Sequence, residues 1–192
     1  MSRRHRYCAV LDACVLYPAP LRDLLLSLAA AGVYGARWTS RIQDEWIRNI
    51  LINRPDLDPS RLARTATLMR DAIDDCLIDN FEHLIDSLTL PDPDDRHVLA
   101  AAIVGRTDAI ITFNLKDFPD TSTSVHGIEI VHPDDFIEAQ YLRDPAKILS
   151  IISGLRARLT KPSVPADRLL STYEQQGLPK LSNFLRNRID LI

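Results

Sequence analysis

Four acidic residues, Asp12, Glu45, Asp95 and Asp117, stand where an α/β sheet presents ligands, at strand ends or in the first turns of the following helices. Carboxylates crowded together without a cation would repel one another or take up protons, so such a cluster predicts a bound metal ion. Hard divalent cations such as Mg²⁺ and Mn²⁺ prefer carboxylate and amide oxygens and keep water molecules for substrate phosphates. A site of this kind could activate water for in-line attack on a phosphodiester.

Each acid taken singly also has a structural explanation. Helix N-termini favour acidic residues through the helix dipole, so Asp94 or Asp95 alone is more often a cap than a catalyst. Asp44 is an alternative to Glu45, and Asp92 or Asp94 could share the third ligand position. The metal site is therefore indicated by the four positions together.

The segments that must hold these acids alternate between strand and helix. Strands are predicted at residues 7–11, 36–39, 109–113 and 128–131, with a further candidate within 81–85. Helices are predicted at residues 21–31, from 40 to before Pro55, 59–76, about 95–104 and 133–142. This order predicts a parallel sheet covered by helices on both faces. Ser40 and Gln43 are predicted to form a capping box at the start of the second helix.

The character of the chain changes after about residue 142. Three helices are predicted at 145–159, 165–175 and 178–190, with no strand among them. We therefore expect an α/β domain at residues 1–142, which contains the four acids, and a helical C-terminal extension at 143–192. Residues 140–192 contain nine Lys and Arg against four Asp and Glu, a net charge of +5, whereas residues 1–139 carry −8. The basic segment is either a solvated helical face or a surface that attracts phosphate.

Composition limits the classes of protein to which the chain can belong. The 192 residues, 46% hydrophobic and 26% charged, suit one globular domain with a full core. The apolar runs are too short to span a bilayer and no secretory signal is visible, so we expect a cytoplasmic protein. Cys8, Cys14 and Cys76 follow no metal-binding spacing and are predicted to be reduced core residues, so that any metal would have oxygen ligands.

Four blocks of the sequence resemble the signature blocks of PIN-domain nucleases. They are residues 10–16 (VLDACVL), 44–46 (DEW), 95–102 (DRHVLAAA) and 112–118 (TFNLKDF). Their order and spacing over residues 7–140 are similar to those of VapC-type toxins of bacterial toxin–antitoxin pairs. The longer tail resembles that of a subgroup with a C-terminal helical extension.

This resemblance implies a three-layer α/β/α PIN fold and Mg²⁺- or Mn²⁺-dependent cleavage of RNA. It also implies a homodimer that a partner antitoxin neutralises. By position, Asp12, Glu45 and Asp95 match the three principal acids of the family, and Asp117 matches the fourth. Asp95 is preferred over its acidic neighbours because it keeps the spacing to the Ala-rich helix. Further matches are the supporting polar positions Thr112 and Asn114, whereas Cys14 stands where many relatives have a small polar residue.

Three other functions are alternatives to the metal-dependent nuclease. The first is a catalytically inert PIN-like module that binds RNA or protein. The second is a phosphatase of the haloacid-dehalogenase type, which needs a second Asp at position 14, where this chain has Cys. The third is a nucleotide-binding Rossmann domain, which needs a Gly-rich fingerprint that does not follow Asp12.

The remaining candidates are expected to be structural. His97 is predicted to be a satisfied, partly buried residue rather than a proton-transfer group, and Trp38 and Trp46 are predicted to lie in the core. Three arginines could bind phosphates, although each is expected to lie on the solvated surface. They are Arg22, Arg41 and Arg96.

Overall fold

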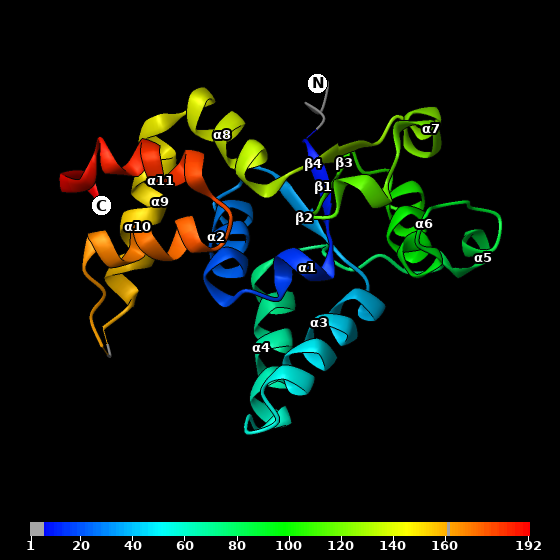
Figure 1. Ribbon diagram of the computed structural model, residues 1–192, viewed down its shortest axis with the longest axis horizontal. Coiled ribbons are helices and arrows are strands. Elements are labelled where there is room, and N and C mark those ends of the chain that lie inside the picture. Colours follow the sequence, from blue (N-terminus) through cyan, green and yellow to red (C-terminus); the bar gives the residue numbers. More distant parts are fainter. Residues whose placement is uncertain (1–5, 161) are drawn as a thin grey trace.

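Four parallel strands form the centre of the molecule in this computed structural model, which describes residues 6–160 and 162–192 (Figure 1). They are β1 (Cys8–Leu11), β2 (Gly35–Arg37), β3 (Ala109–Ile111) and β4 (Glu129–Val131), in the order β2-β1-β3-β4. Ala9 pairs with Ala36 on one side and with Ala109 on the other. The two central strands, β1 and β3, therefore end side by side, which brings the residues that follow them together.

Helices cover both faces of this sheet. On one side α6 (Arg96–Val104) contacts β1 and β3, and its small residues Ala100, Ala101 and Ala102 are fully buried. On the other side α2 (Ala19–Ala30) contacts β2, and α8 (Pro133–Arg143) lies nearby (Figure 1). The predicted three-layer α/β/α arrangement with a parallel sheet is confirmed.

Two helices project away from the sheet as a pair, α3 (Ser40–Asn53) and α4 (Pro59–Ala72) (Figure 1). The residue that caps α3 is Thr39, whose hydroxyl accepts a hydrogen bond from the Ile42 N–H at 3.0 Å. The predicted capping box at Ser40 was therefore wrong by one residue, because Thr39 already has the extended backbone that a cap requires. The helix α4 ends at Ala72 rather than Cys76, since Ile73 is extended and Asp75 is left-handed.

Short helices occupy several of the connections between the main strands and helices. These are α1 (Ala13–Leu16), α5 (Glu82–Ile85), η1 (Pro93–Asp95), η2 (Leu115–Asp117), α7 (Asp120–Thr123) and η3 (Ser124–His126). The strand predicted within residues 81–85 was wrong, because this segment forms α5. Its apolar residues Phe81, Leu84 and Ile85 follow the spacing of a helix face rather than the alternation of a strand.

The C-terminal extension consists of α9 (Pro145–Arg158), α10 (Ala166–Gln175), α11 (Pro179–Arg186) and η4 (Ile189–Leu191). All three predicted helices are present, although the last one ends earlier than expected. The helix α9 contacts α2 and α8, and α11 contacts α8 and α10. Because α8 touches both parts, the domain boundary at 142–143 stays a prediction, and residues 1–5 of the first domain lie outside the described residues. None of the described helices combines the length and apolar character needed to cross a bilayer.

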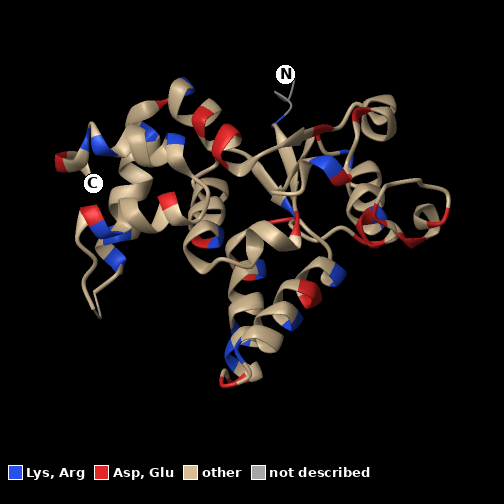
Figure 2. Cartoon of the chain, viewed as in Figure 1, with Lys and Arg blue, Asp and Glu red and all other residues tan. Residues whose placement is uncertain are grey.

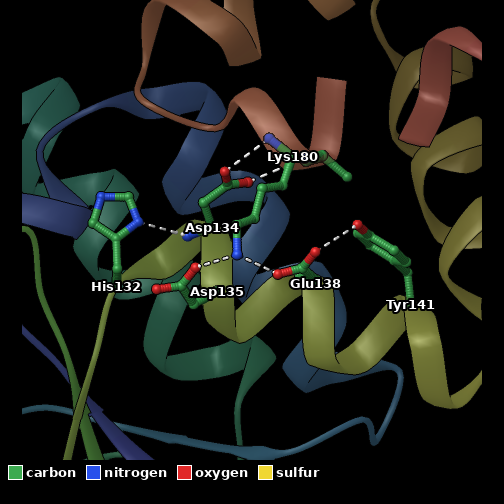
Figure 3. Close-up of polar contacts among 7 residues, drawn as sticks. His132, Asp134, Asp135, Glu138, Tyr141 and Lys180 are labelled. Carbon is green, nitrogen blue, oxygen red and sulfur yellow. Dashed lines mark hydrogen bonds and ion pairs between the residues drawn. The ribbon is translucent and has the colours of Figure 1, made fainter. Parts of the chain in front are cut away.

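A buried carboxylate joins the extension to α8 (Figure 3). Asp134, only 3% exposed, accepts hydrogen bonds from the backbone N–H groups of Lys180 at 2.8 Å and Leu181 at 3.1 Å. It thereby satisfies two of the N–H groups that the first turn of α11 leaves without partners inside the helix. The Lys180 ammonium adds exposed ion pairs to Asp135 at 2.8 Å and to Glu138. Asp134 is therefore the main polar link between α8 and α11.

Replacing Asp134 with Ala is expected to lower the free energy of unfolding by about 2 kcal/mol, because it leaves two helix N–H groups without their acceptor. The matched control is Asp135→Ala, which removes only an exposed ion pair to the same lysine and should cost less than about 1 kcal/mol. Urea unfolding of the two variants measures the difference. Equal losses would show that the exposed charges, and not the buried cap, hold α11 in place.

Candidate active site

Asp12 lies at the end of β1 and is held rigidly by three hydrogen bonds. One carboxylate oxygen, Oδ1, accepts from the Ala13 N–H at 2.6 Å. The other oxygen, Oδ2, accepts from the Thr112 hydroxyl at 2.7 Å and from the Cys14 thiol at 3.1 Å. Only 4% of Asp12 is exposed, and this burial raises the pKa of its carboxyl group. The side chain is thus oriented by two residues of α1 and by the residue that directly follows β3.

Cys14 takes part in this arrangement, which its expected role as a core residue did not include. Its sulfur accepts a hydrogen bond from the Phe113 N–H at 3.3 Å while the thiol donates to Asp12. Burial raises the pKa of the Cys14 thiol, so the group stays protonated and remains a donor. Cys14 therefore supplies a hydrogen bond that orients the Asp12 carboxylate. All three cysteines are free, but only Cys76 is fully buried.

The supporting residues follow β3. Thr112 is fully buried; its hydroxyl donates to Asp12 and accepts a hydrogen bond from the Asn114 N–H at 3.0 Å. Asn114 lines the cavity beside Asp12. The structure thus places both predicted supporting residues next to the acid that they were expected to support.

The four predicted acids share one electrostatic environment. The pKa of Asp95 is raised to about 7, mostly by burial and then by the charges of Asp12, Asp92, Asp117 and Glu45. Asp92 itself caps η1 by accepting from the Asp94 N–H at 2.9 Å, so it has a structural role. Figure 2 shows acidic residues gathered where the chain leads into α6. The sequence therefore located a set of carboxylates whose charges act together on Asp95.

A cavity of about 360 Å³ brings three of these acids together. Its lining residues are Asp12, Ala13, Cys14, Tyr17, Glu45, Asn49, Asn53, Asp95 and Asn114. Asp117 contributes to the charge around Asp95 but does not line this cavity. The sequence prediction missed Tyr17, Asn49 and Asn53. The signal for the two amides was present, because they follow Glu45 at intervals of four residues and so share its helix face.

Glu45 stands between this cavity and a second one of about 520 Å³, which is lined by Arg41, Asp44, Glu45, Arg48, Asp94 and His97. The His97 Nε2 atom lies 3.3 Å from the Glu45 carboxylate, and only 3% of His97 is exposed. His97 is therefore buried with Glu45 as the partner of Nε2, but its buried Nδ1 atom has no hydrogen-bond partner among the described residues, so the prediction of a satisfied histidine was wrong for this atom. Asp44 and Asp94, the alternatives to Glu45 and Asp95, line the second cavity and not the cavity that holds Asp12. This arrangement favours Glu45 and Asp95 over their neighbours.

Arg22 departs from its expected surface position. It is buried, donates a hydrogen bond to the Leu16 carbonyl at 2.8 Å and stacks over the Trp46 ring at 4.7 Å. Burial lowers the pKa of its guanidinium group. Trp46 and Trp38 are fully buried, as predicted. Arg22 therefore helps to hold α2 against α3 and does not face the site.

The donor set suits a hard divalent cation. Within the described ranges, no three carboxylate, imidazole or thiolate groups converge closely enough to enclose a metal ion by themselves. Mg²⁺ commonly keeps several water ligands and uses one or two carboxylates, so it does not need such a cage. Burial and then neighbouring carboxylates raise the pKa values of Asp12 and Asp95, and a bound cation would favour the charged form of both groups. The arrangement could thus hold Mg²⁺ or Mn²⁺ on oxygen ligands.

Comparisons with known proteins match two parts of the chain. Residues 8–116 match the PIN domain family, and residues 133–187 match the family described as VapC50 C-terminal domain. A protein of Mycobacterium tuberculosis (strain ATCC 25618 / H37Rv) named "Putative ribonuclease VapC50" is 40% identical over 82 residues, which are 42% of this chain and 48% of that protein. The chain thus matches about half the length of this relative. No solved structure matches the chain.

Proposed function

Since the chain belongs to the PIN-domain family, with the C-terminal extension of a VapC-type protein, we propose that it is a metal-dependent endoribonuclease. The observation that carries this proposal is the single cavity lined by Asp12, Glu45 and Asp95. The name of the relative in Mycobacterium tuberculosis supports RNA as the substrate.

In this proposal Asp12, Glu45 and Asp95 hold Mg²⁺ or Mn²⁺, and Asp117 supports a second cation. Such an ion, when bound, would activate water and stabilise negative charge on the phosphodiester. Thr112 and Cys14 keep the Asp12 carboxylate in place through their hydrogen bonds, and His97 orients Glu45. Asn114 offers a neutral polar group beside these acids. The protein thus contributes preorganised ligands for the metal ion and the phosphate.

The biological setting that we propose is the toxin of a type II toxin–antitoxin pair, active in the cytoplasm. Its partners are a neutralising antitoxin protein and a second copy of the same chain, in a homodimer. The family match over residues 133–187 supports a VapC-type protein with this extension.

The purified full chain is expected to cut single-stranded RNA in the presence of Mg²⁺ or Mn²⁺ and to lose this activity when EDTA is added, because no side chain replaces the metal-activated water. Sequencing of the cut ends of cellular RNA after expression identifies the cleavage site. Calorimetric titration with Mn²⁺ separates the alternatives: an inert module would neither bind the ion nor cut RNA. Cleavage that persists in EDTA would refute the metal-dependent mechanism.

A further inference from the structure

Helix α3 forms a shared wall of the two cavities that meet at Glu45. Arg41, Glu45 and Arg48 line the 520 Å³ cavity, and their spacing of four and three residues places them on one helix face. Glu45, Asn49 and Asn53 line the 360 Å³ cavity at successive intervals of four. One helix therefore presents cations on one side of a proposed metal ligand and amides on the other.

The cationic side has guanidinium groups available for a ligand. Arg41 and Arg48 are exposed, and neither makes a hydrogen bond or ion pair within the part of the chain that the structure describes. Arg54, at the far end of the same helix, is instead bound to Asp56 at 2.7 and 2.8 Å. A free guanidinium group offers several N–H donors in a fixed fork that fits a phosphate. Arg41 and Arg48 are thus suited to the phosphate of a nucleic-acid backbone.

Carboxylates near these arginines limit what they can hold. Asp44 and Asp94 line the same cavity, so a free phosphate ion would be bound weakly there. A nucleic-acid strand that is also bound in the neighbouring cavity loses less entropy when it makes the second contact, because its phosphate is already close to the arginines. The site therefore favours a polymer over a single anion.

The amide side has the chemistry of a nucleoside pocket. Asn53 Nδ2 donates to the Tyr17 hydroxyl at 3.0 Å, which leaves the carbonyl oxygen of Asn53 free to accept. Asn49 is half-buried and makes no hydrogen bond through its amide among the described residues. The described lining of this cavity contains neither Lys nor Arg. Unpaired bases are recognised by hydrogen bonds to their edges and by aromatic rings, so Tyr17, Asn49 and Asn53 suit a base beside the acids that would hold the metal ion.

We propose that α3 is the track on which single-stranded RNA crosses the site. A backbone phosphate lies on the Arg41 and Arg48 side of Glu45, and the adjoining nucleoside occupies the pocket formed by Tyr17, Asn49 and Asn53. This inference rests on the proposed ribonuclease function and assigns its substrate contacts. It separates recognition into a charge-dependent part that ignores sequence and an amide-dependent part that senses the base.

The first test measures how salt affects binding of fluorescent 2′-O-methyl RNA oligonucleotides, which resist hydrolysis, by fluorescence anisotropy at a fixed Mg²⁺ concentration. For the double variant Arg41→Ala/Arg48→Ala, the slope of log K against log salt should fall by roughly 0.7, the contribution of one phosphate contact on a single strand. Affinity should fall equally for every sequence. The control Arg61→Ala/Arg64→Ala removes two exposed charges from α4, which lines neither cavity, and should leave the slope unchanged.

The second test uses Asn49→Ala/Asn53→Ala with oligonucleotides of A, C, G or U. The order of affinities should change while the salt slope stays that of the wild type. An unchanged order of bases, or an equal slope in both arginine double variants, would overturn the proposed track. A wild type that binds these oligonucleotides as expected but cuts no RNA would refute the proposed function alone. A wild type that cuts RNA while neither pair of variants alters binding would refute the track alone.

Discussion

Replacing Asp12 with Asn is expected to reduce kcat/KM for RNA cleavage by at least about a thousandfold, because loss of a metal ligand removes several kcal/mol of transition-state stabilisation. Asp12 is the acid with the most complete support, since three hydrogen bonds hold its two oxygens. The amide of Asn is a weak ligand for Mg²⁺ in comparison with a carboxylate. Cleavage assays at saturating Mg²⁺ and Mn²⁺ measure the loss.

The same variant should remain folded, which separates a catalytic effect from a structural one. Burial raises the pKa of Asp12, so its negative charge costs folding energy in the metal-free protein. The neutral Asn should therefore leave the thermal midpoint of the metal-free protein unchanged or higher. Asp44→Asn is the control, since Asp44 is an exposed acid that does not line the Asp12 cavity, and it should keep most of the activity. Wild-type cleavage by the Asp12 variant would refute the site assignment.

The stability of the metal-free protein is expected to fall as the pH rises from about 4 to about 7. The pKa of Asp95 is raised from 3.8 to about 7, first by burial and then by the surrounding carboxylates. The folded protein therefore keeps a proton over a pH range in which the unfolded chain has lost it, so deprotonation favours unfolding across this window. Below that window the stabilising proton is present in both states. Asp12 acts in the same direction because its pKa is also raised.

Metal binding should show the opposite trend. An ion that binds Asp95 must displace its proton below about pH 7, so Mn²⁺ affinity should rise by roughly tenfold per pH unit between pH 5 and 7 and then level off. Calorimetric titrations with Mn²⁺ at several pH values measure this slope, and urea unfolding in EDTA measures the stability. Asp95→Asn should weaken both pH dependences. If both stayed as in the wild type, the proton would belong to another group.

The local sequence was sufficient to predict the class of fold and to name four acids, three of which the fold brings to one cavity. Short apolar runs alternating with amphipathic helices specify a parallel sheet, because each hydrophobic face needs a partner layer. Asp12 and Asp95 were identified from their places at a strand end and a helix start, which depend only on neighbouring residues. This reasoning fails where a segment is too short to distinguish the hydrophobic repeat of a helix from that of a strand. Residues 81–85 were expected to contain a strand, but they include the short helix α5.

Contacts between distant segments were decided by the tertiary structure alone. Thr112 donates to Asp12 across 100 positions, because the sheet order places β3 beside β1. The burial of Arg22 against Trp46 likewise depends on how α2 meets α3. Periodicity shows which residues share a face of one element, but strand order and helix packing determine which faces meet. For this reason the four acids could be named from the sequence, whereas the hydrogen bonds by which Thr112 and Cys14 orient Asp12 emerged only from the fold.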